Sequence, residues 1–210
     1  MASDAAWSAL ICGGVRVTHN AGERMLTQGT SGRDVIVLIG GAVKITYDAE
    51  DGTGALLAIR GPGDLLGEIA YGDSGARSAT AWAMESCTAC RYNADQFTEV
   101  VTQHRLREQL DRYRNAKIRE GAELLWRAST RRVEARIAAL LLNVMAVSVS
   151  GERPAHVIPM TQEDIAGCLG TGLRTVNLAF VGLKRMGLVR TGRGRVEVIQ
   201  PRKLAQLARP

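Results

Sequence analysis

Glycine is distributed very unevenly along this 210-residue chain, and that distribution limits where long helices can form. Residues 1–90 contain 14 of the 23 glycines, whereas residues 91–150 contain only Gly121. Glycine weakens helix interiors and is favoured in tight turns. The apolar segments between these turns are short: residues 35–39, residues 55–59, and the alternating Val43, Ile45 and Tyr47. Strands of this length and spacing predict an antiparallel sandwich or barrel in the first part of the chain.

Residues 95–147 lack proline and are rich in alanine, leucine, arginine and glutamate, which is the composition of a helix. One face of this segment repeats at spacings of four or three residues: Leu106, Leu110, Tyr113, Lys117, Gly121, Leu124 and Ala128. We expect this face to pair with a second copy of the chain. The alternative is that it packs on its own barrel. A break is expected at Ser129–Thr130, and an apolar face resumes at Val133 in the core of a second domain.

Two short helices around a glycine turn are predicted after the loop-like stretch 148–154. The first begins at the N-cap Thr161, with Asp164 three residues later, and stops at Gly170. The second runs from Gly172 to Met186. A small hairpin follows over residues 188–199. Together these elements predict a winged helix-turn-helix.

Positive charge is concentrated near the end of the chain. Residues 151–210 contain 10 lysines and arginines against 4 acidic residues, whereas residues 1–150 contain 17 of each. A basic region beside a helix-turn-helix favours double-stranded DNA as the partner. Arg174 is expected to pair with guanine and Asn177 with adenine. The full set of predicted DNA contacts is Thr161, Gly172, Leu173, Arg174, Thr175, Asn177, Leu178, Arg193 and Arg195.

A second informative segment, residues 67–80, is rich in glycine and carries one acid and one arginine nine residues apart. Arg77 and the hydroxyl of Ser78 suit the phosphate of a small cyclic phosphodiester, and Glu68 can accept a hydrogen bond from a ribose hydroxyl. From chemistry alone, a plain Glu68–Arg77 ion pair in a loop explains the same residues. The predicted ligand-binding residues are Gly67, Glu68, Ile69, Ala70, Arg77, Ser78 and Ala79.

Several other classes of protein are disfavoured. The histidines are isolated, and Cys87 and Cys90 form a lone CxxC inside an apolar stretch, so we predict a structural role for these cysteines and no metal site. No activated nucleophile or carboxylate pair points to an enzyme. Apolar runs are too short for a membrane span, and the N-terminus lacks a basic region leading into an apolar run. We therefore expect a cytoplasmic protein that does not bind membranes.

The order of a glycine-punctuated barrel, the segment Gly67-Glu68…Arg77-Ser78-Ala79, a long helix and a C-terminal helix-turn-helix resembles the Crp/Fnr family of bacterial transcription regulators. The resemblance covers nearly the whole chain. It implies an α+β fold: a cyclic-nucleotide-binding jelly roll at residues 1–103, a dimerisation helix at 104–128 and a winged helix-turn-helix at 129–210. It also implies a homodimer, a two-fold DNA operator, RNA polymerase as a partner and a cyclic nucleotide as effector.

Three departures from the family pattern affect these expectations. Cyclic-AMP-responsive members carry hydroxyl residues that bind adenine where this chain has Gly121 and Ala122. Cyclic AMP is the first candidate, but the nucleotide stays open. The recognition helix lacks the family's usual opening and has Leu178 where an arginine is seen, so its operator should differ. Only Cys12 lies near the N-terminus, which disfavours the iron–sulfur branch of the family.

We expect a dimeric DNA-binding regulator in which nucleotide binding moves the two recognition helices through a hinge near Ala128–Thr130. One alternative is a ligand-independent regulator whose barrel only supports dimerisation, which Gly121 and Ala122 favour. The other is a nucleotide-binding regulatory subunit of a partner enzyme, which the basic wing disfavours.

Arg174 and Arg193 are expected to act differently on DNA. Arg174→Ala should relax the preference for one base, because it removes a contact to a base edge. Arg193→Ala should weaken binding to all sequences about equally, because it removes a backbone contact. Binding competition among duplexes with single base changes measures both effects. Unchanged specificity in Arg174→Ala would contradict the predicted groove contact.

Overall fold

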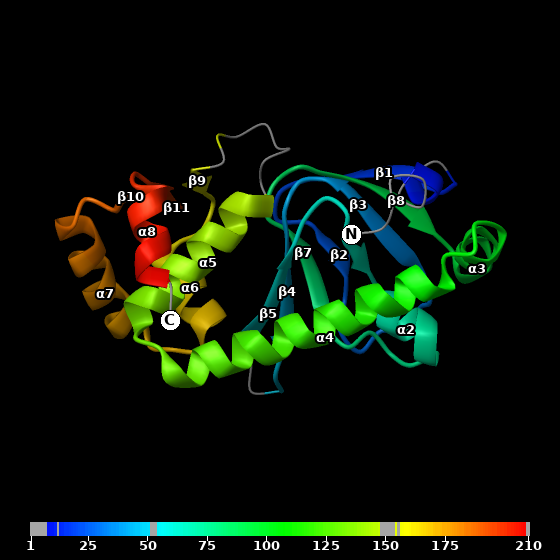
Figure 1. Ribbon diagram of the computed structural model, residues 1–210, viewed down its shortest axis with the longest axis horizontal. Coiled ribbons are helices and arrows are strands. Elements are labelled where there is room, and N and C mark those ends of the chain that lie inside the picture. The colour runs from blue at the N-terminus through cyan, green and yellow to red at the C-terminus, as the bar shows by residue number, and fades with distance from the viewer. Residues whose placement is uncertain (1–7, 12, 51–53, 148–153, 155, 209–210) are drawn as a thin grey trace.

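The computed structural model describes residues 8–11, 13–50, 54–147, 154 and 156–208. Two parts of the chain are visible in Figure 1: a β-rich roll made by the N-terminal half and a smaller helical domain made by the C-terminal third. Helix α4 (Arg107–Thr130) runs along the molecule from the first part to the second. No single described helix is long and apolar enough to cross a membrane.

Two four-stranded antiparallel sheets form the β-roll, with strand orders β1-β8-β3-β6 and β2-β7-β4-β5. This architecture confirms the predicted antiparallel sandwich. The strands are β1 (Val15–His19), β2 (Arg24–Leu26), β3 (Val35–Gly40), β4 (Val43–Asp48), β5 (Gly54–Arg60), β6 (Leu65–Leu66), β7 (Thr80–Ala83) and β8 (Cys87–Tyr92). The three segments predicted from apolar runs are β3, β4 and β5.

Strand β3 is buried on both faces, which explains why its sequence is a continuous apolar run. Ile36 and Leu38 point between the two sheets, whereas Val35 and Val37 point into a second cluster beneath the helices. On the neighbouring strand β8, Cys87 belongs to the cluster between the sheets and Cys90 to the cluster beneath the helices. Because successive side chains of a strand point to opposite faces, the CxxC spacing does not bring these two thiols together.

Among the described residues, the roll is flanked by helices that include α2 (Glu68–Asp73), α3 (Ala94–Gln103) and α4. A reciprocal capping box between Asn93 and Gln96 starts α3. Leu110 on α4, together with Leu106 just before it, is buried against the roll of the same chain. The expectation that this face pairs with a second copy is therefore wrong at these positions. A 4-3 spacing identifies an apolar face but does not say which surface covers it.

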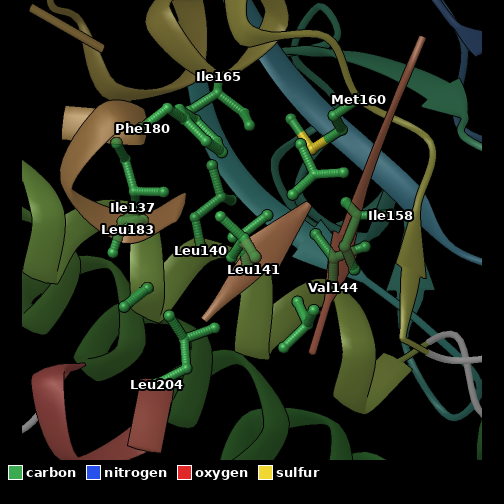
Figure 2. Packing of buried hydrophobic residues seen from close by; sticks show 14 of the residues in the cluster. Ile137, Leu140, Leu141, Val144, Ile158, Met160, Ile165, Phe180, Leu183 and Leu204 are labelled. Carbon is green, nitrogen blue, oxygen red and sulfur yellow. The ribbon is translucent and has the colours of Figure 1, made fainter. Parts of the chain in front are cut away.

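The C-terminal domain is a winged helix-turn-helix, as predicted. It comprises α5 (Val133–Val147), β9 (Val157–Ile158), α6 (Gln162–Leu169), α7 (Leu173–Arg185), β10 (Val189–Gly192), β11 (Arg195–Val198) and α8 (Pro201–Ala208). Helices α6 and α7 cross at 115°, as expected for this motif. Buried residues from α5, α6, α7 and α8 meet in its core, including Ile137, Leu141, Ile165, Phe180, Leu183 and Leu204 (Figure 2).

This core extends beyond the helix-turn-helix to the β-roll. Ala42, Ile59 and Met84 of the roll belong to the same buried cluster as α5 and α6. At the end of β5, a Cβ atom on Gly61 would lie 2.5 Å from the Cβ of Val147 on α5. Any side chain at position 61 would therefore force the two parts of the molecule apart.

The predicted hinge lies near the end of α4. That helix continues to Thr130, and Arg131 and Arg132 separate it from α5. The side chains of residues 124, 125 and 127–130, which include the last members of the predicted stripe, lie outside the described part of the structure.

Candidate functional site

The segment from β6 to β7 closes over a small cavity in the β-roll, of about 90 Å³. All seven predicted ligand residues line it: Gly67, Glu68, Ile69, Ala70, Arg77, Ser78 and Ala79. Sequence reasoning missed its other walls: Leu26, Ile45, Arg60, Leu65, Leu66 and Ala81. Ligand pockets are usually at least about 300 Å³. The cavity is therefore smaller than a typical ligand pocket.

Arg77 is a buried cation in the wall of this cavity, with only 5% of its surface exposed. Its Nη1 donates to the carbonyl oxygen of Gly67 (3.0 Å) and its Nη2 to that of Asp34 (2.8 Å). The carboxylate of Asp34 is bound instead by Arg91 (Nε–Oδ2 3.0 Å). Burial lowers the pKa of the Arg77 guanidinium. Nearby carboxylates of Asp34 and Glu68 favour the charged form, but among the described residues the guanidinium donates to two backbone carbonyls, so an added anion would stabilise it further.

Gly67 lets the backbone approach Arg77 this closely. Its φ of 83° is in the left-handed region. A Cβ atom there would lie 2.6 Å from the carbonyl oxygen of Asp34 and 2.2 Å from Nη1 of Arg77. Glycine at this position is thus required by the same contact that orients the guanidinium.

Glu68 opens α2 and stands close to the cavity without pairing with Arg77. Among the described residues no ion pair joins these two side chains. The loop ion pair considered as an alternative is therefore not formed. Burial raises the pKa of the Glu68 carboxyl, and the nearby guanidiniums of Arg60 and Arg114 only partly offset this.

The other predicted ligand residues differ in accessibility. Ser78 is exposed, so its hydroxyl can be reached from solvent, and Ala79 is half-buried. Ala70 is buried, whereas Ile69 is 53% exposed although it borders the cavity. The cavity is thus polar on the side of Arg77 and Ser78 and largely apolar on the side of Leu26, Ile45 and Leu66.

Helix α4 is fastened to the rim of this cavity by a polar network that the sequence did not reveal. The hydroxyl of Tyr113 accepts the backbone N–H of Leu65 (2.9 Å) and donates to Oδ1 of Asp64 (3.2 Å). Nζ of Lys117 pairs with Oδ1 of Asp64 at 2.7 Å. Arg114 donates to the backbone oxygen of Glu68 (2.9 Å). One face of α4 therefore holds the strand, the turn and the short helix that shape the cavity.

Arg60 completes this network at the end of β5. Its side chain is only 13% exposed, borders the cavity, and pairs through Nη1 with Oε1 of Glu120 on α4 at 2.8 Å. Glu120 also binds Lys117 (3.1 Å). The two residues of the Arg60–Glu120 pair are sixty positions apart in the sequence, so no local pattern could have predicted it.

Helix α7 presents the predicted DNA-contacting residues on its exposed face. Val176, Ala179, Phe180 and Leu183 are buried, whereas Leu173, Arg174, Thr175, Asn177 and Leu178 are exposed. Gly172 is the N-cap of α7 and is exposed. Arg193 and Arg195 are exposed in the turn and second strand of the wing. The structure thus places these residues where DNA could reach them.

Thr161 stands apart from that group because its hydroxyl is used locally. It is the N-cap of α6, where its Oγ1 accepts the N–H of Asp164 (2.9 Å) and donates to Oδ2 of Asp164 (2.7 Å). The predicted N-cap is confirmed. The predicted DNA contact of Thr161 stays a prediction.

Replacing Glu68 tests the effect of its burial on stability. The pKa of the Glu68 carboxyl is raised in the folded state, so the native chain binds the carboxyl proton more tightly than the unfolded chain does. Native stability therefore falls as the pH rises from about 4 through the folded pKa. Glu68→Gln should be more stable than the wild type at about pH 8, and this advantage should vanish near pH 4. Urea unfolding at several pH values measures it.

Glu99→Gln, on the exposed part of α3, is the matched control for that experiment. It removes a carboxylate that solvent already surrounds, and its stability difference from the wild type should not change with pH in the same way. Parallel pH profiles for wild type and Glu68→Gln would contradict the proposed burial effect.

Comparison with known proteins matches both parts of the chain. A family model for the cyclic nucleotide-binding domain matches residues 16–104, and one for the Crp-like helix-turn-helix domain matches residues 135–207. A cAMP-activated global transcriptional regulator, described as CRP-like, from Mycobacterium tuberculosis is 29% identical over 191 residues, 90% of this chain and 85% of the relative. The cyclic AMP receptor protein of Thermus thermophilus is 28% identical over 198 residues, 92% of this chain and 88% of the relative.

A third relative and a solved structure extend this similarity. The transcriptional activator protein FnrA of Stutzerimonas stutzeri is 26% identical over 190 residues, 89% of this chain and 78% of the relative. A solved CRP-family transcriptional regulator from Thermus thermophilus has the same fold, with a TM-score of 0.77 at 23% identity over 91% of this chain and 96% of that chain. These domains and relatives are those of transcription regulators, not of enzymes. With both domains in this order along one chain, the protein belongs to the Crp/Fnr family of transcription regulators.

Proposed function

We propose that this protein is a homodimeric DNA-binding regulator whose affinity for a two-fold operator is controlled by a cyclic nucleotide in the β-roll. The proposal rests on Arg77, whose guanidinium is buried in the cavity wall. Among the described residues, the hydrogen-bond partners of this guanidinium are backbone carbonyls. The cyclic phosphate of the nucleotide is the anion that binds Arg77 at this site. A site of this kind lies within the part of the chain that matches the cyclic nucleotide-binding domain.

Each predicted ligand residue has a part in this proposal. Arg77 and the Ser78 hydroxyl bind the phosphate, and Glu68 accepts a hydrogen bond from the ribose hydroxyl. The remaining four, Gly67, Ile69, Ala70 and Ala79, shape the cavity wall. Cyclic AMP is the first effector to test, because two relatives are named for it.

Ligand entry would act on α4 through the cavity rim. The cavity of about 90 Å³ must widen to hold a nucleotide, and the Arg60–Glu120 pair stands at its edge. Displacing this pair alters the contacts between β5 and α4. The effector shifts DNA binding only to the extent that it binds the widened and closed states with different affinity.

Dimerisation is assigned to the face of α4 that its own roll does not cover. Ile118 is 70% exposed and Trp126 is 53% exposed, with the exposed Ala122 between them. These three residues are spaced by four and lie on one side of the helix. The dimer would place the two recognition helices about 34 Å apart to read both halves of the operator. RNA polymerase as a partner and the cytoplasm as location stay predictions.

A ligand-independent regulator is the second candidate. The small size of the cavity favours it, as does the lack of side-chain donors at Gly121 and Ala122, both of which are exposed on α4. In that case the Arg60–Glu120 pair would be a permanent part of the fold, and the roll would serve only to hold α4 in place.

Calorimetric titration of cyclic AMP and cyclic GMP separates the two candidates. We expect micromolar binding of at least one nucleotide by the wild type. Arg77→Gln should weaken it by about 100-fold or more, because a buried charge pair is lost. Ser78→Ala, which removes a single neutral donor, should weaken it by about tenfold.

Arg112→Gln is the control, because Arg112 is a 72% exposed cation on α4 away from the cavity rim. It should bind as the wild type does. Circular dichroism checks that each variant is folded. The absence of binding by either nucleotide at millimolar concentration would contradict ligand control and favour the second candidate.

A further inference from the structure

Helix α7 carries an unusual number of apolar side chains on its solvent-exposed face. Leu173, Leu178 and Val181 are 42%, 67% and 47% exposed. The helix core does not need them, because Val176, Ala179, Phe180 and Leu183 already fill the buried side. In Figure 1, α7 lies at the end of the molecule furthest from the β-roll, so the roll does not cover this face.

Part of this apolar surface lies on the same side of α7 as the residues predicted to contact bases. At 100° per residue, Arg174, Asn177, Leu178 and Val181 fall within an arc of about 100°. The buried residues of α7 occupy the opposite side. Arg174 and Val181 are about 10 Å apart along the axis, which is close to the rise of three base pairs. Leu178 therefore stands beside Arg174 and about one to two base pairs further along a groove.

The charges near this face of α7 indicate which kind of partner binds it. Exposed cations lie on the same helix at Arg174, Lys184 and Arg185, and the wing adds Arg193 and Arg195. A protein partner for an apolar patch normally brings an apolar surface of its own, whereas DNA brings a dense line of phosphates. Apolar side chains on a helix that also carries exposed cations fit a DNA major groove better than a second protein.

Within the major groove, the only apolar group on a base edge is the C5-methyl of thymine. We propose that Leu178, supported by Val181, reads thymine methyl groups next to the base pair that Arg174 contacts. The preferred half-site then contains one or more thymines within about three base pairs of a guanine. This inference rests on the DNA-binding function of the helix-turn-helix and does not depend on nucleotide control.

Replacing thymine by uracil in the operator tests this directly, because uracil keeps every hydrogen-bonding group and lacks only the methyl. The full-length chain, with and without cyclic AMP or cyclic GMP, first selects sites from a randomised duplex library. Each thymine of the selected half-site is then replaced singly by deoxyuridine, and affinity is measured by fluorescence anisotropy. We expect at least one position where uracil weakens binding by about fourfold per half-site, the effect of one buried methyl group.

Three variants assign that effect to its side chain. In Leu178→Ala the ratio of the affinities for thymine and uracil sites should fall to nearly one, because the main apolar partner of the methyl group is lost. In Arg174→Ala the ratio of the affinities for thymine and uracil sites should persist, even though the overall affinity for DNA falls. Met186→Ala is the matched control, an exposed apolar residue at the end of α7 and outside the arc, and should leave the difference unchanged.

Each contrary result has a distinct meaning. A selected half-site without thymine near the Arg174-dependent guanine, or an equal uracil penalty in wild type and Leu178→Ala, overturns the inference while DNA binding stands. Unchanged DNA binding in Leu178→Ala together with a changed sedimentation mass shows that this face binds protein, which also overturns it. Failure to enrich any sequence overturns the assignment of DNA binding and the inference with it.

Discussion

Strand β5 lies between the two parts of the molecule, and both depend on it. Ile59 points into the core that it shares with α5 and α6, while its neighbour Arg60 borders the cavity and pairs with Glu120 of α4. Successive side chains of a strand point to opposite faces. Under the proposed control, a change on the cavity side of β5 would reach the surface that supports the helix-turn-helix, where Gly61 lies against Val147 with no room for a side chain.

This arrangement gives the proposed nucleotide control a specific physical basis. The network through Tyr113, Lys117 and Glu120 holds α4 against the cavity rim in the structure described. Binding of an anion at Arg77 would favour a state in which the cavity is wider and this network is rearranged. Coupling of this kind is limited by the difference between the ligand's affinities for the two states, and commonly amounts to about 5- to 150-fold.

The sequence predicted the parts whose signals are local, and missed those that arise from contacts between distant residues. Apolar runs between glycines identified β3, β4 and β5, and a capping pattern at Thr161 identified α6. Gly67, Glu68, Arg77 and Ser78 were found as a motif and line one cavity. Arg60 could not be found in this way, because its importance comes from Glu120, sixty residues away. The stripe beginning at Leu106 was assigned to the wrong surface at Leu106 and Leu110, since spacing alone does not distinguish a partner chain from the chain's own roll.

DNA affinity measured with and without nucleotide tests whether the cavity controls the helix-turn-helix. Fluorescence anisotropy on the selected operator, at fixed salt, compares the wild type with Arg77→Gln. We expect a saturating nucleotide to change the affinity of the wild type by about fivefold or more and to leave that of Arg77→Gln unchanged. Equal affinity of the wild type for DNA with and without bound nucleotide would contradict it.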